Sequence, residues 1–99
     1  MVVGTVAFDV LLGDVRSLKA KRGVVRPIIA ELGRRFSVSA AETGSIDLHR
    51  RAEIAVALVG SSHAHVNDVL DECERWVAAR PEVELLSTRR RVLDDDDLD

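Results

Sequence analysis

The spacing of apolar residues switches between two periods along this chain, and the order of the switches limits the folds that it can adopt. An apolar residue at every second position is typical of a strand with one buried face. Apolar residues three or four positions apart are typical of an amphipathic helix. Alternation and short runs of small and β-branched residues predict strands at 2–12, 37–42, 51–59 and 82–93. The helical period predicts helices at 17–35 and 62–80.

Serines and prolines mark the boundaries of the two predicted helices. Ser17 is expected to cap the first helix, and Ser61 or Ser62 the second, because a serine hydroxyl accepts a hydrogen bond from the free amides of a first turn. Pro81 stops the second helix. Pro27 lies inside the first helix and removes one backbone hydrogen bond, so we expect a bend or an irregular first turn there.

The predicted order is therefore strand, helix, strand, strand, helix, strand. Two right-handed strand–helix–strand units joined in this order form a ferredoxin-like α+β two-layer sandwich, a four-stranded antiparallel sheet with two helices on one face. Residues 1–93 are enough for a single domain of this kind. Residues 94–99 hold five aspartates and one leucine, so we expect an acidic, disordered tail.

Charge is unevenly distributed along the chain. The formal net charge is −3, but five of the 17 acids lie in the tail, and the 14 lysines and arginines outnumber the acids that remain. Seven of these bases fall between residues 15 and 35, where Glu31 is the only acid. Lys19, Arg22 and Arg26 are three and four positions apart, so they share one face of the first predicted helix.

Several short blocks of the sequence resemble the YlxP-like family, a small bacterial family of unknown function. The most specific block is Ser17-Leu18-Lys19-Ala20-Lys21-Arg22, and the others fall at 36–42, 47–53, 64–66 and 81–86. The resemblance spans residues 1–93 and implies the same ferredoxin-like fold. Genes of this family often lie beside those for transcription termination factors, translation initiation factors and a ribosome-binding factor. That neighbourhood implies a role near translation or ribosome maturation.

Three features of this chain differ from the family pattern. His49 stands where an aromatic residue, usually tryptophan, is typical, and this bears on the loop at 45–51. Pro27 interrupts the first helix and bears on how the basic residues are presented. The aspartate tail is an addition.

The basic helix is the strongest candidate for a binding surface, because a row of cations beside a helix N-terminus suits the phosphates of a nucleic acid. The residues expected to contact phosphate are Arg16, Lys19, Lys21, Arg22, Arg26, Arg50 and Arg51. Two other interpretations stay open. In the first, the cations form a solvated outer face whose stems cover apolar residues. In the second, Lys21 or Arg22 pairs with Glu42 or Glu53 and closes the fold.

The face of the sheet opposite the helices is predicted to carry small and polar side chains. On the central strands these are Thr5, Ala7, Asp9, Glu53, Ala55 and Ala57. None is aromatic, which argues against the base-stacking platform of RNA-recognition motifs. An uncovered face of small residues suits self-association better. A homodimeric protein-interaction domain acting through this face is therefore the alternative function, and a monomer with a partly covered face is the third interpretation.

Few residues favour catalysis or metal binding. Cys73 falls on the apolar stripe of the second helix, where a buried, inert thiol is expected, and a single cysteine cannot form an internal disulfide. His63 and His65 are two positions apart on a helix, so they point to different sides. The chain has no glycine-rich phosphate loop. We therefore expect no enzymatic activity, no cofactor and no metal.

The sequence also bears on location and partners. It contains no secretory signal and no apolar stretch that could span a bilayer, so a cytoplasmic protein without a membrane partner is expected. The first hypothesis is a non-enzymatic accessory protein that associates with RNA or ribosomal particles. A further hypothesis is that the acidic tail folds back on the basic helix and competes with phosphate.

Overall fold

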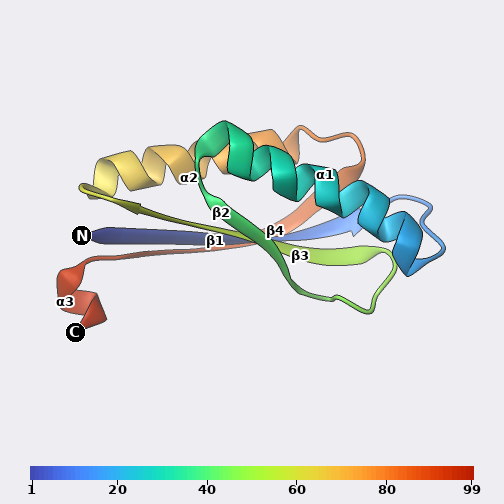
Figure 1. Cartoon of the computed structure of the whole chain (residues 1–99), viewed down its shortest axis with the longest axis horizontal. Helices are drawn as coiled ribbons and strands as arrows, with labels where there is room; N and C mark the ends of the chain where they lie inside the picture. Colours follow the sequence, from blue (N-terminus) through green and yellow to red (C-terminus); the bar gives the residue numbers. More distant parts are fainter.

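The computed structural model describes residues 1–99 and has the element order that the sequence predicts. The elements are β1 (Val2–Leu12), α1 (Leu18–Phe36), β2 (Ser39–Gly44), β3 (Arg51–Gly60), α2 (His63–Ala78), β4 (Val83–Leu93) and a short extra helix, α3 (Asp95–Leu98). The four strands form one antiparallel sheet in the order β2-β3-β1-β4. Helices α1 and α2 cover one face of this sheet (Figure 1). The predicted α+β, ferredoxin-like topology is confirmed.

β1 supplies five of the 16 buried hydrophobic residues of the core. Its residues alternate between buried and half-buried over the whole strand, and Val6, Phe8 and Val10 are completely buried. Each such side chain contributes about 1.5–3 kcal/mol when it leaves water. The helices supply the facing layer with Val25, Ile28, Leu32, Val66, Leu70, Cys73 and Val77. β3 adds Ala52, Ile54 and Val56 to the core. The core therefore lies between the two central strands, β1 and β3, and the two helices, and the opposite face of the sheet is left open.

Both main helices begin where a serine caps them. The Ser17 hydroxyl accepts a hydrogen bond from the Ala20 amide at 3.0 Å, and the Ser62 hydroxyl accepts one from the His65 amide at 3.1 Å. Pro27 does not end α1, which continues to Phe36. The first helix is thus a single element that accommodates Pro27 within it.

Gly4 sets the distance between α2 and the sheet. A β-carbon at position 4 would lie 2.3 Å from Cγ1 of Val66 and 3.0 Å from Cδ1 of Leu70. Carbon atoms do not approach so closely, so any side chain there would push α2 away from β1. The absence of a side chain at Gly4, near the start of β1, therefore permits the close helix–sheet packing.

The acidic tail forms a helical turn where the sequence predicts disorder. Asp94 caps this turn with its side chain, and the Asp97 carboxylate accepts a hydrogen bond from the Asp94 amide. Acidic groups are favoured at a helix N-terminus because they face the positive end of the helix dipole. Asp95 also pairs with the Met1 amino group at 3.0 Å. The tail therefore lies beside the N-terminus, at the opposite end of the molecule from the start of α1 (Figure 1), and does not cover the basic residues as hypothesised.

Candidate functional site

Most of the cations in this protein are already held by other groups. Nine of the 14 lysines and arginines bond an acidic side chain or a backbone carbonyl. The five that bond neither are Lys19, Arg22, Arg26, Arg75 and Arg91, and all five are exposed. Three of them lie together on α1, on the face that the sequence spacing predicts. The other two lie apart from each other, on α2 and β4.

Lys19, Arg22 and Arg26 line an open hollow of about 400 Å³ on the outer face of α1. Gly23 and Pro27 complete the lining, and both are exposed. A β-carbon at Gly23 would meet nothing within 4 Å, so the missing side chain opens space on the solvent side. The hollow has no acidic residue in its lining. It is therefore a cationic depression that no side chain fills at Gly23. We call it the α1 hollow.

Lys21 does not belong to the α1 hollow. Its side chain is 2% exposed, and its Nζ lies 2.8 Å from Oε2 of Glu42. Oε2 of Glu42 has no hydrogen-bond partner, whereas Nζ donates hydrogen bonds to the carbonyls of Ser45 at 2.7 Å and Ile46 at 3.3 Å. Of the interpretations left open by the sequence, the structure shows the pairing with Glu42. Lys21 is therefore not available for the phosphate contact that the sequence suggested, because its ammonium is buried and already bonded.

The other three residues expected to contact phosphate also lie outside the α1 hollow. Arg16 is exposed just before α1 and pairs with Asp14 at 3.2 Å. Arg50 donates through Nε to the Gly13 carbonyl at 2.9 Å, which ties the start of β3 to the end of β1. Arg51 belongs to the open face of the sheet. Only Arg16 is placed to extend the cationic surface at the helix start.

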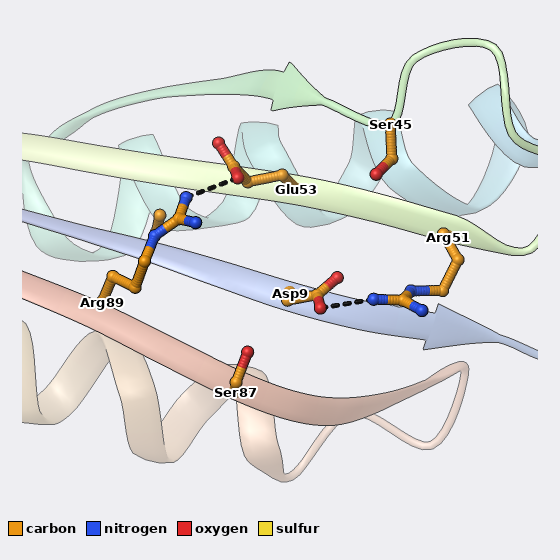
Figure 2. Close-up of a pocket in the computed structure, with 7 residues that line it drawn as sticks. Asp9, Ser45, Arg51, Glu53, Ser87 and Arg89 are labelled. Atoms are coloured by element: carbon orange, nitrogen blue, oxygen red, sulfur yellow. Dashed lines mark hydrogen bonds and ion pairs between the residues drawn. The ribbon is translucent and has the colours of Figure 1, made fainter.

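A second hollow, of about 140 Å³, lies on the open sheet face, and Figure 2 shows the two ion pairs that line it. Arg51 pairs with Asp9, and Arg89 pairs with Glu53 at 2.6 Å. The Thr43 hydroxyl also donates to Glu53 at 2.6 Å. This hydrogen bond, followed by the one from Arg89, lowers the pKa of the Glu53 carboxyl. The remaining lining residues are Ala7, Ser45 and Ser87.

Two β-bulges lie in the outer strands at the level of this sheet-face hollow. Thr43 is the extra residue of β2 opposite β3, and Leu86 is the extra residue of β4 opposite β1. A bulge bends its strand and resets the alternation of side chains. The reset brings Ser87 and Arg89 to the open face. Neither residue was among those expected there from the sequence. The broken alternation of β4 was the available signal, but alternation alone does not say which residue is extra.

The other titratable groups are dispersed. Cys73 is completely buried, as expected, and burial raises the pKa of its thiol to about 11. His63 bonds Asp94 at 3.3 Å, and this contact lowers the pKa of the Asp94 carboxyl. No three histidine, cysteine or acidic side chains are grouped in a way that could hold a metal ion. No helix combines the length and the apolar character needed to cross a membrane.

Comparison with known proteins assigns the family. A family described as a protein of unknown function, DUF503, matches residues 3–90. The chain belongs to the DUF503 family. The uncharacterised protein YlxP of Bacillus subtilis (strain 168) is 30% identical over 87 residues, which cover 88% of this chain and 95% of the relative. The resemblance to the YlxP-like family is therefore confirmed. DUF503 carries no assigned function, so the arrangement of side chains is the basis for any proposal.

Proposed function

We propose that this protein is a non-enzymatic accessory protein of the cytoplasm that associates with RNA or ribosomal particles, with the α1 hollow contacting phosphates. The supporting observation is that Lys19, Arg22 and Arg26 are exposed and bond no acid, although the protein holds 17 acidic residues. An unpaired cation can bind a phosphate without first breaking an ion pair. Three such cations around one depression thus form the surface of this protein best suited to a polyanion.

The proposed contact is electrostatic and has little base specificity. Three cations that each neutralise one phosphate of a single strand give a slope of about −2 in a plot of log K against log salt. Affinity then falls roughly 20-fold between about 50 and 200 mM salt. Phosphate contacts fix position but do not read sequence. On their open face, the central strands of the sheet carry no aromatic side chain for base stacking, because Phe8 of β1 is buried in the core.

A charge reversal on α1 tests this proposal. The variant combines Lys19→Glu and Arg22→Glu, two positions where no native bond is lost, so its thermal unfolding should match that of the wild type closely. Its matched control combines Arg75→Glu and Arg91→Glu, which change the net charge equally at exposed, unpaired sites on α2 and β4. Binding to labelled single-stranded RNA is followed by fluorescence anisotropy at low salt.

The α1 variant is expected to lose RNA binding and the control to keep most of it. Binding that survives the α1 reversal, or that disappears equally in both variants, contradicts a specific role for the α1 hollow. Co-sedimentation with ribosomal particles, with and without ribonuclease, provides an independent measurement on the wild type, the α1 variant and the control.

A second candidate function is a homodimeric interaction domain that uses the open sheet face. The two ion pairs, Asp9 with Arg51 and Glu53 with Arg89, neutralise the charges that line the sheet-face hollow. A second copy can cover such a face without burying these charges unpaired. Ala57→Arg places a new charge on a central strand of this face. Light scattering after size exclusion should show a wild-type dimer and a monomeric variant, and a monomeric wild type rejects this candidate.

A further inference from the structure

The α1 hollow contains a hydrogen-bond acceptor that an uninterrupted helix would satisfy internally. In an α-helix the carbonyl of each residue accepts a bond from the amide four positions later. Proline has no amide hydrogen, so residue 27 cannot donate to the carbonyl oxygen of Gly23. The proline ring also crowds this carbonyl, and a helix accommodates the crowding by bending locally. The Gly23 oxygen is thus left without its usual donor inside a helix that otherwise continues from Leu18 to Phe36.

The two residues that flank this acceptor, Gly23 and Pro27, lie at the surface of the helix. Both Gly23 and Pro27 are exposed, and both line the hollow together with the three unpaired cations. The open space above Gly23 would hold a side chain in any other residue. Glycine and proline are the two residues that destabilise a helix interior most. A larger residue would fit at position 23 without any clash, so packing within the chain does not explain the glycine. Gly23 and Pro27 are one turn apart and lie among three cations. The Gly23 carbonyl, which can only accept a hydrogen bond, is therefore next to side chains that can only donate.

We propose that the Gly23 carbonyl accepts a hydrogen bond from a ribose 2′-hydroxyl, so that the α1 hollow binds RNA in preference to DNA. This inference rests on the proposed function and deepens it. Lysine and arginine side chains are donors only, so they bind the phosphates of RNA and DNA alike. A carbonyl is an acceptor only, and the sugar–phosphate backbone of DNA offers it no donor. The 2′-hydroxyl is the one backbone group that is a donor in RNA and absent from DNA.

The size of the effect follows from the single bond involved. One hydrogen bond to a neutral group corresponds to a preference of roughly three- to tenfold. The bond does not change the number of phosphates contacted, so the salt dependence of binding should be the same for RNA and DNA. The expected result is therefore a shift in affinity at every salt concentration without a change in slope.

The experiment compares three labelled oligoadenylates of equal length by fluorescence anisotropy. One is RNA, one is DNA, and one is 2′-O-methyl RNA, which keeps the ribose oxygen but has lost the donor hydrogen. The decisive variant is Pro27→Ala, which restores an amide that can bond the Gly23 carbonyl and leaves all three cations in place. Because alanine favours a helix interior, this variant is expected to fold. Pro81→Ala replaces the other proline of the chain, outside α1, and is the matched control.

Wild type and the Pro81→Ala control should bind the RNA roughly three- to tenfold more tightly than the DNA and the 2′-O-methyl strand, and Pro27→Ala should bind all three equally. Equal wild-type binding of the three strands overturns this inference and leaves the proposed function standing. So does tight binding of both ribose strands, which would indicate recognition of sugar pucker. A preference that persists in Pro27→Ala removes the role of the Gly23 carbonyl. Failure to bind any strand contradicts the proposed function and this inference together.

Discussion

Replacing Lys21 by methionine should destabilise the fold strongly, because one ammonium ties α1 to β2 and to the loop that follows it. The Nζ lies 2.8 Å from Glu42 and donates to the Ser45 and Ile46 carbonyls at 2.7 and 3.3 Å. Methionine keeps the apolar stem, which is 2% exposed, and removes only the charge and the three contacts. The variant therefore measures the polar interactions separately from packing.

The magnitude follows from the burial of the two partners. Removing one member of a buried ion pair costs about 3–5 kcal/mol, because the other charge is left without a partner. Glu42 is 20% exposed and keeps some contact with water, so the lower end applies, about 3 kcal/mol. For a domain of this size, that loss lowers the melting temperature by roughly 12–24 °C. Adding Glu42→Gln to Lys21→Met should restore part of the stability, since it removes the unpaired carboxylate.

Urea unfolding monitored by the fluorescence of Trp76 measures this loss. Trp76 is the only tryptophan, packs edge-on against Phe36 with centroids 6.4 Å apart, and lies under the Arg80 guanidinium at 4.4 Å. Its emission should therefore report the separation of α1 from α2. Lys19→Met, two positions away but exposed and unpaired, should change stability by less than about 0.5 kcal/mol. A Lys21→Met protein as stable as Lys19→Met would refute the structural role assigned to this lysine.

Three further predictions concern glycine, a carboxylate and the thiol. Gly4→Ala should destabilise by about 1–3 kcal/mol through overpacking against Val66, whereas Gly23→Ala should stabilise α1 by about 0.5–1 kcal/mol; thermal unfolding giving the reverse order would contradict both. The Thr43 hydrogen bond, followed by the one from Arg89, lowers the pKa of the Glu53 carboxyl. Glu53 therefore stabilises the fold at pH values above its unfolded pKa of about 4.3. This stabilisation is lost as the pH falls through the lower pKa of the folded state. Glu53→Gln should accordingly flatten the acid side of stability against pH in urea titrations. Cys73, with a pKa of about 11, should react with iodoacetamide at pH ~8 far more slowly in the native protein than in urea, and equal rates would show that the thiol is accessible.

The two periods of apolar residues were sufficient to predict the order and type of the main helices and strands. They did not predict the bounds of β2, where the residues are small. The strand expected at 37–42 lies instead at Ser39–Gly44, because α1 extends to Phe36 and Ser37 adopts a left-handed φ of 54° that ends it. Alanines and serines in β2 carry too little contrast in hydrophobicity to fix a boundary. The tail was predicted from its charge, which does not reveal a cap or the contact between Asp95 and the N-terminal amino group.

Some features of the candidate site could be predicted from local spacing, and others could not. The shared face of Lys19, Arg22 and Arg26 follows from helical spacing, which is local. The burial of Lys21 also follows that spacing, since it stands four positions before Val25, which is buried with it. Lys21 was nevertheless expected to be exposed, because lysines are almost never fully buried unless they are paired. The partners of Arg51 and Arg89 depend on strand register and on two bulges, which are set by packing across the sheet and not by neighbours in sequence.

The central position of β1 has a consequence for synthesis on the ribosome. β1 is made first, yet Val3 lies opposite Leu93 in β4, the last strand to emerge. At roughly 5–20 residues per second, β1 waits on the order of 4–16 s for this partner. During that interval one edge of a long apolar strand has unpaired amides and carbonyls, a condition that favours pairing with other chains. A transcript truncated before Val83 should therefore yield an aggregating nascent chain and not a smaller folded domain.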